Sequence, residues 1–308
     1  SSDLACYGAS RDDMTGLKEG DHLVGYGEVN TLDHVLFFTT QGTYGYTPVY
    51  DVEESRWKEI GSHINSTIRI SGEEKITDAF VLRSFATNAY MISVTKNGLV
   101  KKTAVREYEV SRNNKTMSNM KLLDGDAVVK TMVAYAYDEI LIASKNGFVS
   151  RYPVSLIPET SPRSKGVKAM NLVLDEIVSA CISHGDASQL IVFTDQCQMK
   201  RIKLSDVDVT GRPTKGSMIC KKVKSKPYQI AHIALHDLND ELVIINEETQ
   251  KILAKDISLM SKDATFSSPL HTTQDYYFLR TLAAVEQREL PAIQEEKQEF
   301  EEIELFED

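Results

Sequence analysis

The sequence predicts an all-β protein, folded as a propeller-like ring of about five four-stranded blades. Two observations predict this fold. An apolar run, a tight polar turn and a second strand-like run recur five times along the chain. The turns recur at intervals of 56, 49, 50 and 52 residues, with markers at Gly42, Gly98, Gly147, Cys197 and Thr249. Amphipathic helices are scarce, and the best candidate, residues 281–302, follows the last repeat.

Each repeat begins with a predicted β-hairpin, at residues 34–43, 89–99, 139–148, 189–198 and 241–250. Asn97-Gly98 and Asn146-Gly147 are typical of two-residue type I′ turns, which need positive φ at both central residues. Further apolar runs at 127–133, 176–182 and 229–235 bring the content to about four strands per repeat. Because one blade cannot bury both faces of its sheet, neighbouring blades must stack into a closed or nearly closed ring. The weak fifth repeat favours an open ring.

The predicted domain organisation is a lead-in at 1–20, a five-bladed domain at 21–280 and an acidic tail at 281–308. The tail has a net charge of −8 and is expected to be disordered or loosely docked, with a helix as the alternative. The chain begins without methionine or a signal-like segment, so we expect a fragment of a longer polypeptide. Four widely spaced cysteines without a C-x-x-C pair favour a reduced, cytoplasmic protein over a zinc or redox motif.

Basic residues concentrate in the middle of the chain. Residues 96–226 hold 22 lysines and arginines against 13 acidic residues, a difference of +9, so the flanks carry −19 and the whole chain −10. Basic loops follow the first four hairpin turns by 14 to 16 residues, at 55–61, 111–115, 162–166 and 211–216. A basic residue also lies four positions after the turn marker in the three central repeats.

Stacked repeats place equivalent positions on one rim, so these residues predict a curved basic track that fits the phosphates of bent double-stranded DNA. The alternative is a set of solvated surface charges. The predicted DNA-binding residues are Lys102, Arg112, Lys115, Arg151, Arg163, Lys165, Arg201, Arg212, Lys215, Lys221, Lys222 and Lys224.

Hairpin, basic loop and acidic turn follow one another in a characteristic order, with acidic turns such as Ser71–Ile76 and Leu123–Asp126. From about Asp21 to Ser268 the chain resembles the C-terminal β-pinwheel domain of bacterial type IIA topoisomerase A subunits. The resemblance implies a DNA-binding and DNA-bending domain beside a catalytic core, with the catalytic tyrosine outside this chain. The core belongs to the same polypeptide, and the ATPase B subunit is an expected partner.

Within that family, gyrase A subunits carry a Gln-Arg-Arg-Gly-Gly-Lys-Gly box before the first hairpin and usually six blades. The corresponding stretch here, Ala5–Arg11, has one basic residue and no glycine pair, and only five repeats are present. Both departures favour resemblance to the topoisomerase IV subunit, whose expected role is relaxation and decatenation. A gyrase domain is the alternative.

Other functional classes have weaker support. His232 and His236 have metal-ligand spacing, but the segment lacks a His-Glu-x-x-His pattern and is predicted to be a strand, so we expect no metal, no cofactor and no catalytic residue. A protein-binding propeller is the serious competitor. Trp57 with Phe37, Phe38, Tyr44 and Tyr46 would form its adhesive patch, although aromatic residues in a first blade are typical of a core. A further hypothesis is that the acidic tail folds back on the basic track and competes with DNA.

Overall fold

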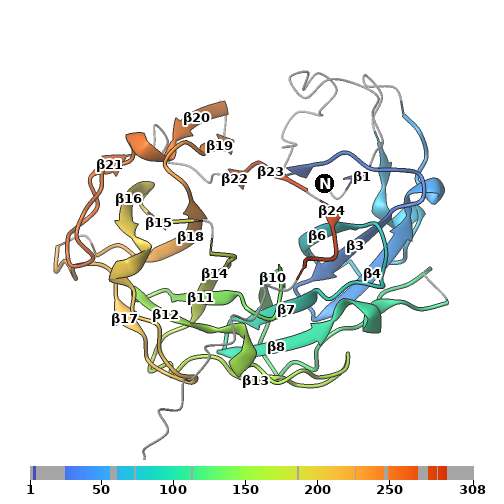
Figure 1. Ribbon diagram of the computed structural model, residues 1–308, viewed down its shortest axis with the longest axis horizontal. Helices are drawn as coiled ribbons and strands as arrows, with labels where there is room; N and C mark the ends of the chain where they lie inside the picture. Colours follow the sequence, from blue (N-terminus) through green and yellow to red (C-terminus); the bar gives the residue numbers. More distant parts are fainter. Residues whose placement is uncertain are drawn as a thin grey trace, which may run out of the picture.

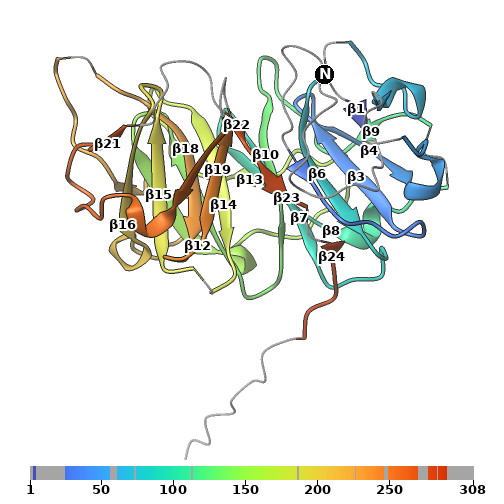
Figure 2. The same cartoon turned by 90° about the horizontal axis from the view of Figure 1, so that it is seen from above.

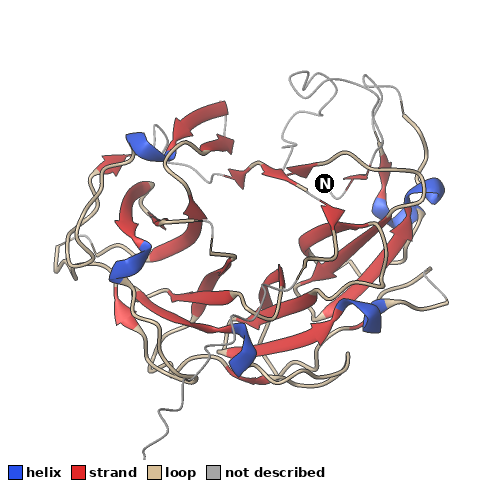
Figure 3. Ribbon diagram, in the orientation of Figure 1, coloured by secondary structure: helices blue, strands red, loops and turns tan. Residues whose placement is uncertain are grey.

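The computed structural model describes residues 3–4, 25–55, 61–72, 74–111, 114–185, 187–225, 227–245, 249–269, 277–282 and 284–289. Within these ranges the chain consists of β-strands, loops and short 3-10 turns, without an α-helix (Figure 3). None of these helical turns has the length and apolar character needed to cross a membrane. The predicted all-β class is confirmed.

Five hairpins form the middle of five sheets, which we number as blades 1 to 5, and they are the hairpins that the repeat predicts. A 3-10 turn follows each of them, at Val49–Asp51, Val105–Tyr108, Val154–Leu156, Leu204–Asp206 and Ala254–Asp256. The hairpins are β3–β4 (His34–Thr39, Thr43–Pro48), β7–β8 (Tyr90–Thr95, Leu99–Ala104), β11–β12 (Glu139–Ser144, Phe148–Pro153), β15–β16 (Gln189–Thr194, Gln198–Lys203) and β19–β20 (Glu241–Ile245, Thr249–Leu253).

The turns of these hairpins are one residue longer than predicted. Gly98 has a φ of 94°, but Asn97 is not left-handed, which rules out the type I′ geometry. The Gly98 amide donates to the Thr95 carbonyl at 3.1 Å, as in a type I turn followed by a left-handed residue. The Thr95 hydroxyl accepts the Leu99 amide at 3.1 Å, and this bond stabilises the longer loop. Cys197 takes the left-handed place in blade 4 with a φ of 55°.

Blades 1 to 4 each gain an inner strand from their own repeat and an outer strand from the following repeat. The inner strands are β6 (Ile76–Leu82), β10 (Val128–Ala134), β14 (Ile177–Ser183) and β18 (Ile230–His236). The outer strands, which pair with β4, β8, β12 and β16, are β9 (Met117–Ser118), β13 (Val167–Lys168), β17 (Ser217–Met218) and β21 (Ser268–Pro269).

Four strands per blade are thus confirmed for these four blades, but the assignment of all four to one repeat is wrong. The chain pairs first with the edge of the preceding blade and then crosses to the axis side of its own blade. Two-residue outer strands carry no periodicity that a sequence could reveal.

The blades surround a central opening, and one C-terminal segment spans the space between blade 5 and blade 1 (Figures 1 and 2). Blade 5 contains β19, β20 and β22 (Tyr277–Phe278). After it, β23 (Arg280–Thr281) pairs with β2 (Gly25–Tyr26), and β24 (Ala284–Val285) pairs with β6. Residues 277–289, the closing segment, therefore join the last blade to the first.

The ends of the predicted domain consequently need adjustment. Residues 284–289 pack on blade 1 as part of the ring, which corrects the prediction of a helix or a tail from residue 281 onward. The remainder of the predicted tail, residues 290–308, lies outside the described residues. At the other end, β1 (Asp3–Leu4) pairs with β5 (Ser62–His63), and the rest of the predicted lead-in also lies outside them.

The hydrophobic core is divided among the interfaces between consecutive blades. Ile92 and Met132 of blade 2 pack with Ile140 and Tyr152 of blade 3 in one such cluster. Aromatic rings fill the interface of blades 1 and 2, where the Tyr108 ring lies 4.8 Å from that of Tyr44, centroid to centroid. Burial of apolar area at every interface is what holds the stacked repeats together.

Candidate nucleic-acid interface

Three of the predicted DNA-binding residues lie between blades instead of on the rim. They are the basic residues four positions after the hairpin turn: Lys102, Arg151 and Arg201, whose exposed fractions are 8%, 16% (side chain) and 9%. Each reaches the 3-10 turn that follows the next hairpin. Lys102 Nζ donates to the Val154 carbonyl at 3.2 Å, and Arg201 Nε donates to the Ile257 carbonyl at 3.1 Å.

Arg151 makes the fullest set of these contacts. Its Nη1 donates to the carbonyls of Leu204 and Val207 at 2.9 and 3.1 Å, and its Nη2 lies 2.6 Å from Glu139 Oε2. A cation that is committed to buried carbonyls and a carboxylate is not available to a phosphate. We therefore remove Lys102, Arg151 and Arg201 from the candidate DNA-binding surface, because they connect neighbouring blades.

Two neighbouring lysines are buried as well, so the count of basic residues overstates the surface charge. Burial lowers the pKa of Lys101 to about 7 and that of Lys200 to about 8. Lys200 Nζ donates to three backbone carbonyls of residues 261, 262 and 264, at 2.8 to 3.1 Å. Both side chains serve the packing of the blades.

The basic loops themselves are on the surface. Each loop follows the 3-10 turn of its own repeat and leads into the outer strand of the preceding blade. Lys115, Lys165 and Lys215 occupy the loops of three consecutive repeats, and all three are exposed. These loops thus carry one lysine each along the outer edge of the ring, as the repeat predicts.

The arginines of these loops differ from one another. Arg163 is exposed, with a left-handed φ of 74° and an amide that donates to the Asn119 carbonyl at 3.0 Å. Arg212 is half-buried, and its Nε and Nη1 donate to the carbonyls of Leu156 and Lys168 at 3.1 and 2.6 Å. Arg212 therefore fastens its loop more than it offers charge. Arg112 lies outside the described residues.

The fourth repeat carries the densest positive charge. Lys215 Nζ lies 4.4 Å and Lys222 Nζ 5.9 Å from the ring centroid of Phe148, at the hairpin tip of blade 3. A shared aromatic ring offsets part of the repulsion between two ammonium groups. Lys221 and Lys224 are exposed in the same stretch, so all four lysines predicted here remain candidates.

Three exposed basic residues beside these loops were missed in the sequence analysis. The Arg69 amide donates to the Asn114 carbonyl at 3.3 Å, next to Lys115, and the Lys121 amide donates to the Ser164 carbonyl at 3.1 Å, next to Lys165. Lys168 is in the outer strand β13. The repeat held a usable signal for Lys121, which follows its turn marker by 23 residues, as Lys221 follows its own by 24.

Polar side chains from equivalent positions of the inner strands face the central opening. Asp78 of β6 lies 2.5 Å from both Lys130 Nζ of β10 and Arg280 Nη1 of the closing segment. Ser179 of β14 contacts His232 of β18, with 3.0 Å between Ser179 Oγ and His232 Nδ1. The cluster joins residues that are 202 positions apart, so it contributes to closing the ring.

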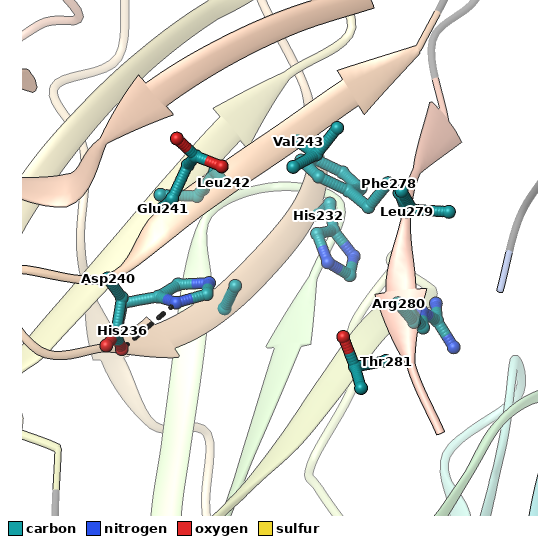
Figure 4. Close-up of a pocket in the computed structure, with 11 residues that line it drawn as sticks. His232, His236, Asp240, Glu241, Leu242, Val243, Phe278, Leu279, Arg280 and Thr281 are labelled. Carbon is teal, nitrogen blue, oxygen red and sulfur yellow. Dashed lines mark ion pairs between the residues drawn. The ribbon is translucent and has the colours of Figure 1, made fainter. Parts of the chain in front are cut away.

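His232 also lines a hollow of about 420 Å³ between β18, β19 and the closing segment (Figure 4). Burial lowers the pKa of His232 to about 3, and its ring stacks on Phe278 with the centroids 4.7 Å apart. His236 Nδ1 points instead at Asp240, 3.4 Å from Oδ2. In the described part of the chain, no three His, Cys, Asp or Glu residues are grouped as metal ligands. Packing and ring closure account for both histidines.

The proposed adhesive patch of a protein-binding propeller is also absent from the described surface. Phe37, Phe38, Tyr44 and Tyr46 are buried, which confirms that they belong to the core. Trp57 lies outside the described residues.

Comparisons with known proteins agree with this architecture. The family described as "DNA gyrase C-terminal domain, beta-propeller" matches residues 33–83, 89–134, 138–184 and 188–236. The A subunit of DNA topoisomerase 4 from Staphylococcus epidermidis is 29% identical over 271 residues, which are 88% of this chain and 34% of that protein. The chain thus spans about a third of the length of such relatives.

Two solved structures have the same fold. The C-terminal domain of DNA topoisomerase IV superposes with a TM-score of 0.77 and 30% identity, covering 83% of this chain and 80% of the other. The DNA gyrase A C-terminal domain superposes with a TM-score of 0.71 at 18% identity, covering 91% and 92%. The four matched segments are the first four hairpins with their inner strands. The chain therefore belongs to the β-propeller family of DNA gyrase C-terminal domains, the C-terminal domain of a type IIA topoisomerase A subunit.

Proposed function

We propose that this domain binds and bends double-stranded DNA along the outer edge of its ring. The single observation that supports this most strongly is the repetition of an exposed lysine, at 115, 165 and 215, in the same loop of three consecutive repeats. Arg69, Lys121 and Lys168 lie beside or just after these loops, and Lys221, Lys222 and Lys224 extend the surface through the fourth repeat. We call the lysines and arginines of this edge, with Arg163, the basic rim.

The physical case rests on charge neutralisation. Each phosphate neutralised by a lysine releases condensed counterions, so affinity is lower at higher salt concentrations by a predictable slope. Lysines at repeated positions on a curved edge favour curved DNA over straight DNA, because more phosphates come within reach. Smooth bending of a short site costs about 1–6 kcal/mol, which several such contacts can offset.

The finer assignment is to the A subunit of topoisomerase IV. Its support is the absence of the gyrase box in Ala5–Arg11, the five-repeat length and the relatives named as topoisomerase 4 subunits. In this proposal the domain is non-catalytic, and it directs ATP-dependent relaxation and decatenation by a cytoplasmic enzyme. Its partners would be the remaining part of the A subunit, which carries the catalytic core, and the ATPase B subunit. A gyrase domain is the second candidate, favoured only by the description of the matching family.

The test measures binding of the chain to duplex DNA across a salt series. The variant Lys165→Ala/Lys215→Ala removes two rim charges. The control Lys203→Ala/Lys255→Ala removes two exposed charges at the other end of the hairpins, away from their turns. Both variants change the net charge equally, so a difference between them reports position alone.

We expect the rim variant to lower the salt slope by about 2 and the affinity by about 30-fold at physiological salt, from a slope of about 0.9 per phosphate. The control should change neither by more than about 2-fold. Equal losses in the two variants would mean that a diffuse field, and not the rim, binds DNA. An absence of binding by the unmodified chain at low salt would overturn the proposed function and favour a protein-binding propeller.

A further inference from the structure

An exposed apolar turn stands beside the basic rim in the third repeat. Val173 and Leu174 have exposed fractions of 75% and 99%. They lie between outer strand β13 and inner strand β14, where the chain crosses from blade 2 to blade 3. Consecutive aliphatic side chains with so little contact are unusual at the surface of a soluble protein, because their burial is favourable.

The backbone of Leu174 makes this residue type more unusual still. Its φ is 50°, in the left-handed region that bulky residues rarely occupy. The corresponding turn of the second repeat has Gly125, with a φ of 74°. The two turns are equivalent, because Asp126 accepts the Asn97 amide at 2.9 Å and Asp175 accepts the Asn146 amide at 3.1 Å. The fold is therefore satisfied by glycine here, and leucine adds strain without adding packing.

The position of the turn relative to the lysines suggests what the leucine contacts. Asn146 Nδ2 donates to the Leu174 carbonyl at 3.2 Å, on one side of the hairpin tip of blade 3. Two residues later in the same tip, Phe148 carries Lys215 and Lys222 against its ring. The Asn171 amide donates to the Thr214 carbonyl at 2.8 Å, so the start of the turn touches the loop of Lys215.

Apolar side chains flanked by cations are the arrangement with which proteins kink DNA. A leucine, valine or similar wedge enters between base steps from the minor groove and unstacks them, while basic residues hold the adjacent phosphates. The carboxylates nearest the turn are already engaged: Asp175 accepts two backbone amides, and Glu176 pairs with Lys96 and Lys145 at 2.9 and 2.8 Å. The turn therefore presents an apolar surface beside unpaired positive charge.

We propose that Val173 and Leu174 form a wedge that inserts between base steps of the DNA held by Lys215 and Lys222, and so fixes the position of a kink in the bent duplex. This inference rests on the proposed DNA-binding function and specifies one contact within it. A wedge acts on base stacking and the rim lysines act on phosphates, so the two contacts respond to different changes in the DNA.

The experiment compares two duplexes of about 30 base pairs, the length of a bent protein site. One is fully paired, and the other has a central mismatch that has already lost part of its stacking. The wedge variant is Val173→Ser/Leu174→Gly, whose glycine reproduces Gly125. The control Leu32→Ser changes an exposed leucine at the end of the blade 1 hairpin away from its turn, and Lys215→Ala/Lys222→Ala removes the phosphate contacts.

We expect the unmodified chain to bind the mismatched duplex about 10-fold more tightly, since the mismatch lowers the unstacking cost of a few kcal/mol. The wedge variant should lose this preference, keep the salt slope and unfold at the same or a higher temperature, because glycine relieves the left-handed backbone. The lysine variant should bind both duplexes more weakly and with a lower slope. Leu32→Ser should behave as the unmodified chain.

Equal preference for mismatched DNA in the wedge variant and the unmodified chain would overturn the wedge while leaving the basic rim in place. No preference in either protein, with a normal salt slope, would also overturn it and would leave the exposed turn as a surface for a protein partner. Absence of salt-dependent binding in the unmodified chain would instead reject the proposed function.

Discussion

Arg151 offers the sharpest test of the distinction between cations that join blades and cations that face DNA. Replacing it with methionine keeps the apolar stem and removes the guanidinium. The change deletes the pair with Glu139 and leaves the Leu204 and Val207 carbonyls without their donor. Net hydrogen bonds to charged groups contribute about 1.5–3 kcal/mol, and an abandoned buried acceptor costs about 1–3 kcal/mol. We expect Arg151→Met to lower the free energy of unfolding by about 3 kcal/mol.

The matched variant is Lys215→Met, which removes an exposed cation of the rim. Surface substitutions away from buried networks change stability by about 0.5 kcal/mol or less. Urea unfolding followed by circular dichroism measures stability, and binding at a temperature where both variants are folded measures DNA affinity. Arg151→Met should lose stability and keep its affinity, whereas Lys215→Met should do the reverse.

The reasoning is refuted if Arg151→Met unfolds as the unmodified chain does and loses DNA affinity as much as Lys215→Met. Unfolding of stacked repeats can occur locally, so native-state hydrogen exchange is a useful second measurement. The amide of Val207, which donates to the Leu204 carbonyl at 3.1 Å, reports directly on the 3-10 turn that Arg151 holds.

Three further predictions concern ionisable groups. Burial lowers the pKa of Lys101 to about 7, so its buried charge opposes folding most strongly below pH 7 and is relieved as pH rises; unfolding free energy should increase by up to about 1.4 kcal/mol per pH unit between pH 7 and 9, and denaturation of Lys101→Met should show a smaller slope. Asp78→Asn should lower stability by about 3 kcal/mol and speed hydrogen exchange in the closing segment, unlike the exposed control Asp124→Asn, because Lys130 and Arg280 lose their shared carboxylate. Removing the acidic residues after Glu289, which leaves the closing segment intact, should raise DNA affinity at low salt if the tail competes for the basic rim; unchanged affinity would contradict this.

The sequence alone was sufficient for the features that arise from short-range rules. Alternation of apolar residues and turn-forming residues marked all five hairpins, and the inner strands at 128–134, 177–183 and 230–236 fell within one residue of their predicted bounds. The even spacing of the basic loops placed Lys115, Lys165 and Lys215 at equivalent exposed positions. These features depend on residues that are close along the chain, so the repeat carries them.

Only the tertiary structure decided which basic residues face solvent. A blade between two others is covered on both faces, so adjacent residues such as Lys101 and Lys102 are both buried, and strand alternation cannot separate surface from interior. The exchange of outer strands, the pairing of Asp78 with Arg280 and the exposure of Leu174 likewise depend on segments that lie far apart in the sequence or on the absence of a neighbour. The hairpins are set by local turn chemistry and alternation, whereas the surroundings of each side chain are set by the blade that packs against it about fifty residues away.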